Sequence, residues 1–220
     1  IKALDISSTM VRASIAKREN VSALLPAKVV TFIREFAIVG GTFDPIHLGH
    51  LHLIKEISNK FEKVIVIPSG TPWLKENPPV ATAEQRFQMT DLAITSMGLS
   101  EKVEVSPIEV KRNGNSYAID TVDELKTIYP NTNFTVVLGS DAARYLAKWH
   151  RSKELLEQVK ILVVKRPGSI QSEYDEISIK ALDISSTMVR ASIAKRENVS
   201  ALLPAKVVTF IREYGLYGSR

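Results

Sequence analysis

The sequence predicts an α/β protein built on a parallel β-sheet. Residues 36–39 form an apolar run of strand length, residues 51–60 place apolar side chains at helical spacing, and residues 63–67 form a β-branched run. A strand, a helix and a strand in this order make a right-handed crossover, which pairs the two strands in parallel. With 220 residues, 45% of them apolar, the chain can bury a large core on such a sheet.

The other elements are expected in order along the chain. Hydroxyl groups at Ser7, Ser8 and Thr9 can cap a helix over residues 10–18, and Pro26 can begin another helix. The later elements are short strands over 102–105 and 108–110, a helix that starts at 116–121 and ends near 129, a strand over 134–138, a helix over 142–147, a final strand over 160–164, and a helix stop at 214–217.

A long amphipathic helix is expected over residues 82–97. Glu84 follows a possible cap at Ala81 or Thr82, three residues after Ala81, and Phe87, Leu92 and Ile94 are candidates for the buried face. This pattern predicts a packing role for the helix.

An internal duplication is the most unusual feature of the chain. Residues 1–35 recur without a single change as residues 179–213. Natural repeats diverge, and a solenoid needs three or more adjacent units. We expect residues 36–220 to form the domain, with 179–213 as the native copy and 1–35 as an addition. The added copy could compete for the same docking site, or dock on a neighbouring chain as a swapped element of a homo-oligomer.

Charge and composition exclude several classes of protein. The net charge is +5, but each copy of the duplicated segment holds six basic and three acidic residues, and without one copy the chain has 23 basic and 21 acidic residues. Basicity is therefore weak support for a nucleic-acid partner. The absence of Cys excludes disulfides, a thiolate nucleophile and Cys-ligated metal. Apolar runs are too short to cross a membrane and residues 1–20 lack a secretory core, so we expect a cytoplasmic protein.

The most informative stretch reads Gly-Gly-Thr-Phe-Asp-Pro-Ile-His-Leu-Gly-His over residues 40–50. It predicts a strand end, a tight glycine turn and the first turn of a helix. Gly40 and Gly41 carry no Cβ, so the backbone there can come close to a ligand. The free amides and the positive dipole end of the helix favour an anion at the same place.

Two histidines follow that turn. His47 and His50 are three residues apart, so on a helix they share one face and can reach one phosphate group. Gly49 between them leaves room for that phosphate. A pair of histidines at this spacing is also typical of a helix surface or a satisfied core, but the preceding glycine turn favours a triphosphate site.

Four further features can serve a ligand site. Lys75 lies in the loop after the second strand, at the sheet edge where open α/β sheets bind ligands, although a solvated lysine is equally typical there. Asp141 follows the strand at 134–138, where it could contact ribose hydroxyls, support a magnesium-bound water or cap the next helix. Trp149 could stack on an aromatic ring or belong to the core, and the amides that open the helix at 116–121 could hold a second anion.

A second hydroxyl-rich motif covers residues 184–190. It places hydroxyls at a helix N-terminus, with Arg190 one turn inside on the face of Ser186 and Thr187. Hydroxyls, free amides and a guanidinium match phosphate oxygens, although a capped surface helix with a solvated arginine has the same pattern. In the first copy the equivalents are Ser8, Thr9 and Arg12. Either set could complete the site, and we favour the second because the chain leads into it through 165–179.

These motifs together resemble the nicotinate-nucleotide adenylyltransferase family of the nucleotidylyltransferase superfamily. The resemblance covers roughly residues 36–217 and leaves out the leading copy. It implies a Rossmann-like, doubly wound parallel sheet with a small C-terminal helical portion. It also implies transfer of an adenylyl group from ATP to nicotinate mononucleotide, giving nicotinate adenine dinucleotide and pyrophosphate in NAD biosynthesis.

The resemblance also implies roles for individual residues. Those on the ATP phosphates would be Thr42, His47, His50, Ser186 and Arg190, with Gly41, Phe43, Gly49, Ile184, Ser185 and Thr187 beside them. Those on the adenosine would be Gly139 and Asp141. Those on the acceptor would be Trp149 under the pyridine, main-chain amides near Ala118 and His150 on the carboxylate, and the neighbouring Tyr117 and Lys75.

The chemistry of this reaction fits the residues present. The attacking group is already a phosphate oxyanion, so positioning and charge neutralisation are needed rather than a strong base. We expect His47, His50, Lys75 and Arg190 to supply the charge. No cluster of carboxylates indicates a protein metal site, so Mg²⁺ is expected to arrive bound to ATP.

Three alternatives stay open from the sequence. Pantetheine-phosphate adenylyltransferases share the ATP motifs, but their acceptor has no pyridine, so Trp149 and the 116–121 segment argue against them. The chain could instead be a nucleotide-binding protein that the leading copy has disabled. A nucleic-acid module would bind DNA or RNA in a salt-sensitive way, and the charge distribution argues against it.

Overall fold

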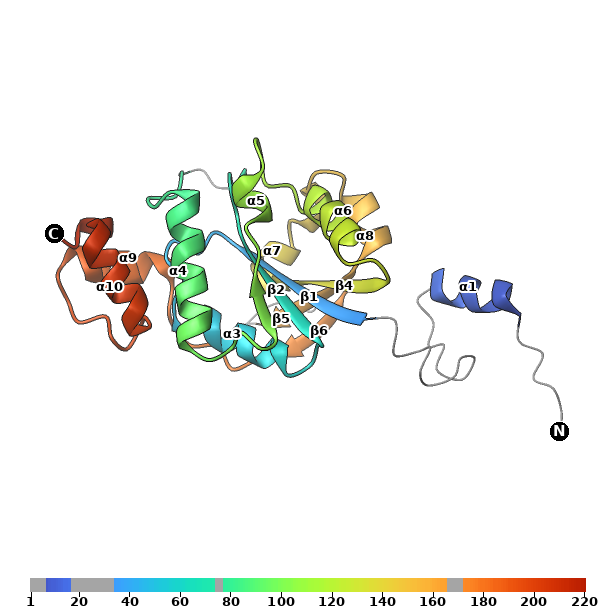
Figure 1. The fold of residues 1–220 in the computed structure, drawn as a ribbon, viewed down its shortest axis with the longest axis horizontal. Coiled ribbons are helices and arrows are strands. Elements are labelled where there is room, and N and C mark those ends of the chain that lie inside the picture. Colours follow the sequence, from blue (N-terminus) through green and yellow to red (C-terminus); the bar gives the residue numbers. More distant parts are fainter. Residues whose placement is uncertain (1–6, 17–33, 74–76, 166–171) are drawn as a thin grey trace.

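The computed structural model describes residues 7–16, 34–73, 77–165 and 172–220. Six parallel strands form one sheet in the order β3-β2-β1-β4-β5-β6 (Figure 1). Their bounds are β1 Arg34–Gly41, β2 Lys63–Pro68, β3 Val103–Val105, β4 Thr132–Gly139, β5 Lys160–Lys165 and β6 Asp175–Ser178. The order reverses between β1 and β4, which makes the sheet doubly wound and confirms the predicted fold class.

Helices cover both faces of the sheet. One face carries α3 (Leu48–Ser58), α4 (Ala83–Ser96), α9 (Ser186–Ala194) and α10 (Ala205–Tyr214). The other carries α6 (Ala118–Ile128) and α8 (Ser152–Gln158), together with the short η1 (Leu146–Lys148). The short elements α5 (Ile108–Lys111), α7 (Ser140–Ala143) and η2 (Leu216–Gly218) complete the domain.

Strand periodicity divides the core into two layers. Along β1, Phe36 and Ile38 point to the α6 side, whereas Ala37 and Val39 point to the α3 side. Ile38 lies opposite Ile65 of β2 and Val136 of β4, so the centre of the sheet is apolar on the α6 side. Apolar runs of this kind are typical of parallel strands that are covered on both sides.

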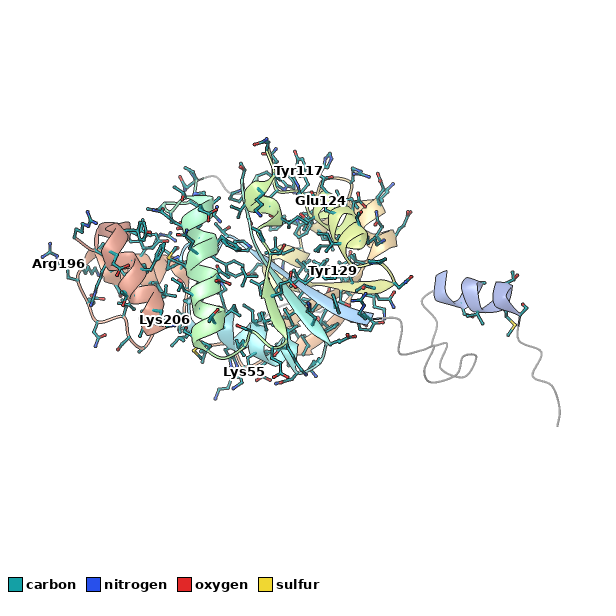
Figure 2. All side chains as sticks on the ribbon, viewed as in Figure 1. Lys55, Tyr117, Glu124, Tyr129, Arg196 and Lys206 are labelled. Carbon is teal, nitrogen blue, oxygen red and sulfur yellow. The ribbon has the colours of Figure 1, made fainter. Side chains whose placement is uncertain are left out.

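The predicted C-terminal helical portion is confirmed. Helix α10 packs on α4, and α9 packs on η2. Gly215 ends α10 in the left-handed conformation, with φ of 63°, as the predicted helix stop requires. Arg196, at the end of α9, points outward from this portion (Figure 2). Helix α1 (Ser8–Ala16), from the leading copy, is drawn at the opposite end of the view from α9 and α10 (Figure 1).

Several predicted elements are wrong in detail. Residues 108–110 belong to the one-turn helix α5 rather than to a strand, and β6 follows the strand that we expected to be the last. The expected helix over 142–147 is split into α7 and η1. Gly40 and Gly41 still belong to β1, so the turn begins only after them. The predicted helix after Pro26 lies outside the described residues.

The predicted amphipathic helix is present as α4, with two corrections. Thr82 is its N-cap and forms a capping box with Gln85, not with Glu84. Of the three expected core residues only Ile94 is fully buried, and Phe87 and Leu92 are half-buried. The buried stripe runs instead through Arg86, Met89 and Ala93, at helical spacing.

Candidate active site

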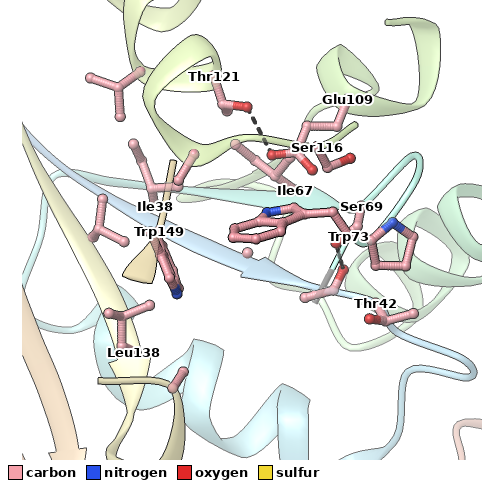
Figure 3. A pocket seen from close by; sticks show the side chains of 17 residues that line it. Ile38, Thr42, Ile67, Ser69, Trp73, Glu109, Ser116, Thr121, Leu138 and Trp149 are labelled. Atoms are coloured by element: carbon pink, nitrogen blue, oxygen red, sulfur yellow. Dashed lines mark hydrogen bonds between the residues drawn. The ribbon is translucent and has the colours of Figure 1, made fainter. Parts of the chain in front are cut away.

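A cavity of about 250 Å³ opens at the C-terminal edge of the sheet, beside the point where the strand order reverses. Strand ends form its floor, through Ile38 and Gly40 of β1, Ile67 of β2 and Leu138 of β4. The indoles of Trp73 and Trp149 stand on its walls (Figure 3). Open α/β sheets bind ligands at this switch point.

The turn after β1 is shaped by Phe43. A Cβ on Gly41 would lie 2.8 Å from the Phe43 ring, so only glycine leaves space for that ring. Phe43 itself has φ of 49° and is buried. The chain then reaches His47, whose extended backbone caps α3. Gly41 thus serves the packing of the turn, and both Gly40 and Gly41 line the open cavity.

The two histidine rings lie together, as their spacing predicted. Their centroids are 3.7 Å apart and the planes differ by 23°. The His47 backbone N–H donates to His50 Nδ1 at 3.3 Å, so the neutral His50 ring carries its proton on Nε2. The phenyl ring of Phe43 meets His50 edge-on, with 5.1 Å between centroids. This contact fixes the orientation of His50 beside the turn.

His47 differs from expectation in its charge. Its side chain is only 4% exposed, and burial lowers its pKa to about 4. The ring is therefore neutral at neutral pH and can offer hydrogen bonds rather than a positive charge. Its Nδ1 atom is buried and has no hydrogen-bond partner. The ring also fills the space beside Gly49, where a Cβ would lie 3.1 Å from it, so Gly49 makes room for the His47 ring.

The second motif lies directly against the first. Arg190 Nη1 donates to the Asp44 carbonyl at 2.8 Å, and Ser186 Oγ donates to the Pro45 carbonyl at 3.0 Å. Arg190 Nη2 also reaches Thr187 Oγ1 at 3.4 Å. The predicted meeting of the two motifs is thus observed. Here the Arg190 and Ser186 side chains bond the backbone of the turn after β1. Ser185 is occupied as the N-cap of α9, and Ile184 packs beside Gly49.

The acceptor-side residues divide into two groups. Trp149 and Ala118 line the cavity, and Trp149 Nε1 is buried without a hydrogen-bond partner. Tyr117 and His150 stack on each other at 4.2 Å between centroids and do not line the cavity. Ala118 is the first residue of α6, so the first-turn amides of this helix, which have no partner within it, face the region of the cavity.

Glu109 is an unexpected carboxyl group on the cavity wall. Its Oε1 accepts a hydrogen bond from Thr121 Oγ1 at 2.8 Å (Figure 3). Burial raises the pKa of Glu109, while the hydrogen bonds from Thr121 and Ser116 lower it. The group is part of a polar wall that includes the start of α6.

The other predicted positions are less central. Gly139 is the N-cap of α7, and Asp141 is exposed in the first turn of that helix, so Asp141 is not the cap. Neither residue lines the cavity. Lys75 lies outside the described residues. Within the described ranges, no group of three or more His, Asp or Glu side chains could hold a metal ion.

The sequence analysis missed the two residues that organise the turn. The Asp44 carboxylate accepts from the amides of Val80 and Ala81, at 2.8 and 3.1 Å, and from Tyr217 Oη at 2.8 Å. Burial and the Asp44 charge raise the pKa of Tyr217. The guanidinium of Arg86 is buried nearby, and this burial lowers its pKa while the Asp44 charge raises it. Arg86 could have been recognised, because it is in phase with the apolar stripe of α4.

Comparisons with known proteins identify the family of this chain. Residues 38–192 match the cytidylyltransferase-like family. A probable nicotinate-nucleotide adenylyltransferase of Oceanobacillus iheyensis is 40% identical over 191 residues, which cover 84% of this chain and 98% of that protein. A protein of the same name from Clostridium tetani is 34% identical over 202 residues, which cover 84% of this chain and 100% of that protein.

A solved structure shares the fold. The Plasmodium falciparum nicotinic acid mononucleotide adenylyltransferase complexed with NaAD has a TM-score of 0.73 at 21% sequence identity. The match covers 85% of this chain and 98% of that one. None of the helices in the described part of the chain is long and apolar enough to span a membrane.

Proposed function

Since this chain belongs to the cytidylyltransferase-like family, and within it to the nicotinate-nucleotide adenylyltransferases, we propose that it transfers the adenylyl group of ATP to nicotinate mononucleotide. A phosphate oxygen of the acceptor attacks the α-phosphorus of ATP, and the bond to the β-phosphate breaks. The products are nicotinate adenine dinucleotide and pyrophosphate. The reaction belongs to NAD biosynthesis.

One observation carries this proposal: the histidine turn and the indole-walled cavity share one edge of the sheet. Gly41 and Thr42 line the cavity at the end of β1, and the stacked His47 and His50 follow Thr42 by five and eight residues. Two substrates bound on the two sides of this strand end would therefore meet over it. Bringing two phosphates together in one geometry is the main requirement of a reaction whose nucleophile is already an anion.

On the ATP side, hydrogen-bond donors matter more than charged side chains. The neutral His47 ring and the His50 ring can donate to phosphate oxygens, and the amides at the start of α3 add the positive end of a helix dipole. Arg190 is about a third exposed and contacts the turn at Asp44. It can turn from the Asp44 carbonyl toward the departing pyrophosphate, where charge develops.

On the acceptor side, the cavity suits a flat ring with one negative group. The Trp149 indole offers a stacking surface, and the amides that open α6 at Ala118 favour a carboxylate over a neutral amide. This preference supports nicotinate over nicotinamide mononucleotide. Phosphopantetheine has no aromatic ring to fill the space beside the indole.

The magnesium ion belongs to the ATP substrate in this proposal. The described residues offer no carboxylate cluster, and Mg²⁺ commonly binds through substrate phosphates. Bound in this way, it would neutralise charge on the triphosphate. The protein's own contribution is to hold both phosphates and to keep water from the cavity.

The proposed function is tested by comparing acceptors. Purified protein is incubated with ATP, Mg²⁺ and either nicotinate mononucleotide, nicotinamide mononucleotide or phosphopantetheine, and pyrophosphate release is measured. We expect kcat/KM for the nicotinate form to exceed that for the nicotinamide form by at least about tenfold, because one lost ionic contact has this effect. No turnover with nicotinate mononucleotide would refute the assignment, and ATP binding by calorimetry without turnover would indicate a disabled enzyme.

A further inference from the structure

Arg86 is the most deeply buried charged residue described, with 1% of its surface exposed. It lies on α4, in the stripe that faces the sheet, and it does not line the cavity. A charged side chain in such a position must form several hydrogen bonds to offset its loss of water. Its partners therefore show what the residue does.

Three backbone carbonyls surround the guanidinium. Nη1 donates to Thr42 at 2.7 Å, Nη2 donates to Gly70 at 3.0 Å, and Nε donates to Ala81 at 3.2 Å. These carbonyls belong to three separate segments: the turn after β1, the loop after β2, and the residue before the cap of α4. A single planar group thus joins the turn of the ATP motif to the loop that carries Trp73.

The Gly70 loop passes this constraint on to the acceptor side. A Cβ on Gly70 would lie 2.1 Å from the Glu109 carbonyl oxygen, so the two backbones are in direct contact. The Glu109 carboxylate then accepts from Thr121 Oγ1 in α6. On the other side, Ser69 N–H and Oγ both donate to the Gly41 carbonyl, at 2.9 and 3.2 Å. The loop after β2 is therefore held between the ATP turn and the cavity wall.

Only an arginine can make this set of bonds. Its guanidinium presents five N–H groups in a rigid plane, whereas a lysine offers one compact ammonium. The nearby Asp44 carboxylate supplies the compensating negative charge. It accepts a hydrogen bond from the Ala81 N–H, and Arg86 donates to the Ala81 carbonyl. Arg86 and Asp44 thus fix the same segment from opposite sides.

We propose that Arg86 is a positioning residue that sets the spacing between the ATP-binding turn and the acceptor cavity. In-line transfer needs the attacking oxygen and the α-phosphorus within about 3.5 Å in one direction, and a misplacement of about 1 Å can reduce the rate about a hundredfold. The guanidinium controls this alignment without touching either substrate. The proposal rests on the proposed function.

The kinetic test uses Arg86→Lys, which keeps the charge and loses the planar fork. We expect kcat to fall by about 10- to 100-fold, with the KM for each substrate changed less than about threefold, because each half-site still binds its own substrate. Unchanged kcat in a folded Arg86→Lys protein would overturn the proposal.

Gly70→Ala is a second variant that leaves Arg86 intact. Its new methyl group must displace the loop from Glu109. It should produce the same kcat-selective loss, and combining it with Arg86→Lys should cost less than the product of the two effects, because both act on one spacing. Fully multiplicative losses would contradict a shared origin.

Met89→Ala is the matched control for destabilisation. Met89 is fully buried on the same helix, in the apolar core between α4 and the sheet. We expect this variant to lower the unfolding temperature while kcat stays within about twofold at a temperature where the protein is folded, because a core cavity affects stability first. A loss of kcat equal to that of Arg86→Lys, at the same folded fraction, would show that Arg86 is only structural.

A measurement without catalysis separates this proposal from the proposed function. Amide hydrogen exchange in the substrate-free protein should be at least about tenfold faster in Arg86→Lys at residues 40–43 and 69–73, and unchanged in α8. If the wild-type protein forms no dinucleotide, the proposed function fails. Hydrogen exchange still tests whether Arg86 holds the two loops together. Unchanged exchange in both loops would refute the role of Arg86.

Discussion

The same nine residues form α1 and α9, and the two helices differ only in their surroundings. Both start with the same cap: Ser7 Oγ accepts from the Met10 amide at 3.1 Å, and Ser185 Oγ accepts from the Met188 amide at 3.2 Å. Yet Val189 of α9 is fully buried, whereas its equivalent Val11 in α1 is only half-buried. The comparison teaches that local sequence specifies a capped helix, while burial depends on a docking partner.

The ends of the two copies differ even in secondary structure. Arg34 and Glu35 belong to β1, where they pair with Thr132 and Asn133 of β4. The identical pair at 212–213 lies inside α10. Intrinsic propensity cannot explain this difference, because the residues are the same. The next element along the chain decides the outcome: a buried strand in one case and a helix stop in the other.

Only the second copy continues into an anchor for the site. Beyond residue 213 the chain reaches Tyr217, whose hydroxyl donates to the Asp44 carboxylate. The leading copy runs instead into β1. These contacts support our proposal that residues 179–213 are the working copy and that most of the leading copy is an addition. The expected domain boundary at residue 36 shifts to Arg34, because Arg34 and Glu35 already pair with β4.

The largest expected difference between the copies concerns their arginines. Arg190→Ala should lower kcat/KM about 100-fold, the usual loss for one group that stabilises developing charge, whereas Arg12→Ala should change it less than about twofold. Steady-state pyrophosphate release measures both. If Arg190→Ala alone has little effect but the protein with both Arg190→Ala and Arg12→Ala is inactive, then the leading copy can complete the site.

Matched core substitutions come next in size. Val189→Ala should lower the free energy of unfolding by about 2 kcal/mol, because two buried methyl groups are lost and a cavity is left, and Val11→Ala should lower it by less than about 0.5 kcal/mol. Urea titrations followed by circular dichroism give both values. Equal losses would mean that α1 is docked as firmly as α9.

A smaller effect is expected for the anchor itself. Tyr217→Phe removes one hydroxyl from the buried Asp44 carboxylate and should cost about 1 to 2 kcal/mol of stability. Tyr214→Phe, at a side chain 54% exposed, is the control and should cost almost nothing. A Tyr217 variant as stable as the control would remove this reason to prefer the second copy.

The smallest effect is expected from deleting residues 1–33. Arg34 and Glu35 must stay, because they pair with β4 in the sheet. We expect kcat/KM within about twofold of the full chain, since none of the described residues removed is buried. Light scattering before and after deletion measures the mass in solution. A smaller particle with no activity would support a swapped assembly in which α1 serves a neighbouring chain.

Some features of this protein were predictable because they depend on neighbours in the sequence. Strand runs, helical periodicity and caps are local, so the parallel sheet, α4, α6 and the hydroxyl cap of α9 could all be predicted. The meeting of the histidine turn with Arg190 was predicted from the resemblance to a known family. Site roles for these residues stay predictions.

Tertiary structure decided what depends on residues far apart in the chain. Strand β6 has only four residues, none of them buried, so its sequence shows no apolar run. Helix α5 is a single turn, and its Ile-Glu-Val sequence alternates apolar and polar residues as a strand does. The neutral state of His47 arises from burial, and the hydrogen bonds of Arg86 reach residues up to 44 positions away in the chain. The helices α1 and α9 have the same sequence but differ in burial for the same reason: a local pattern specifies a helix, but only the folded chain supplies the surface that buries it.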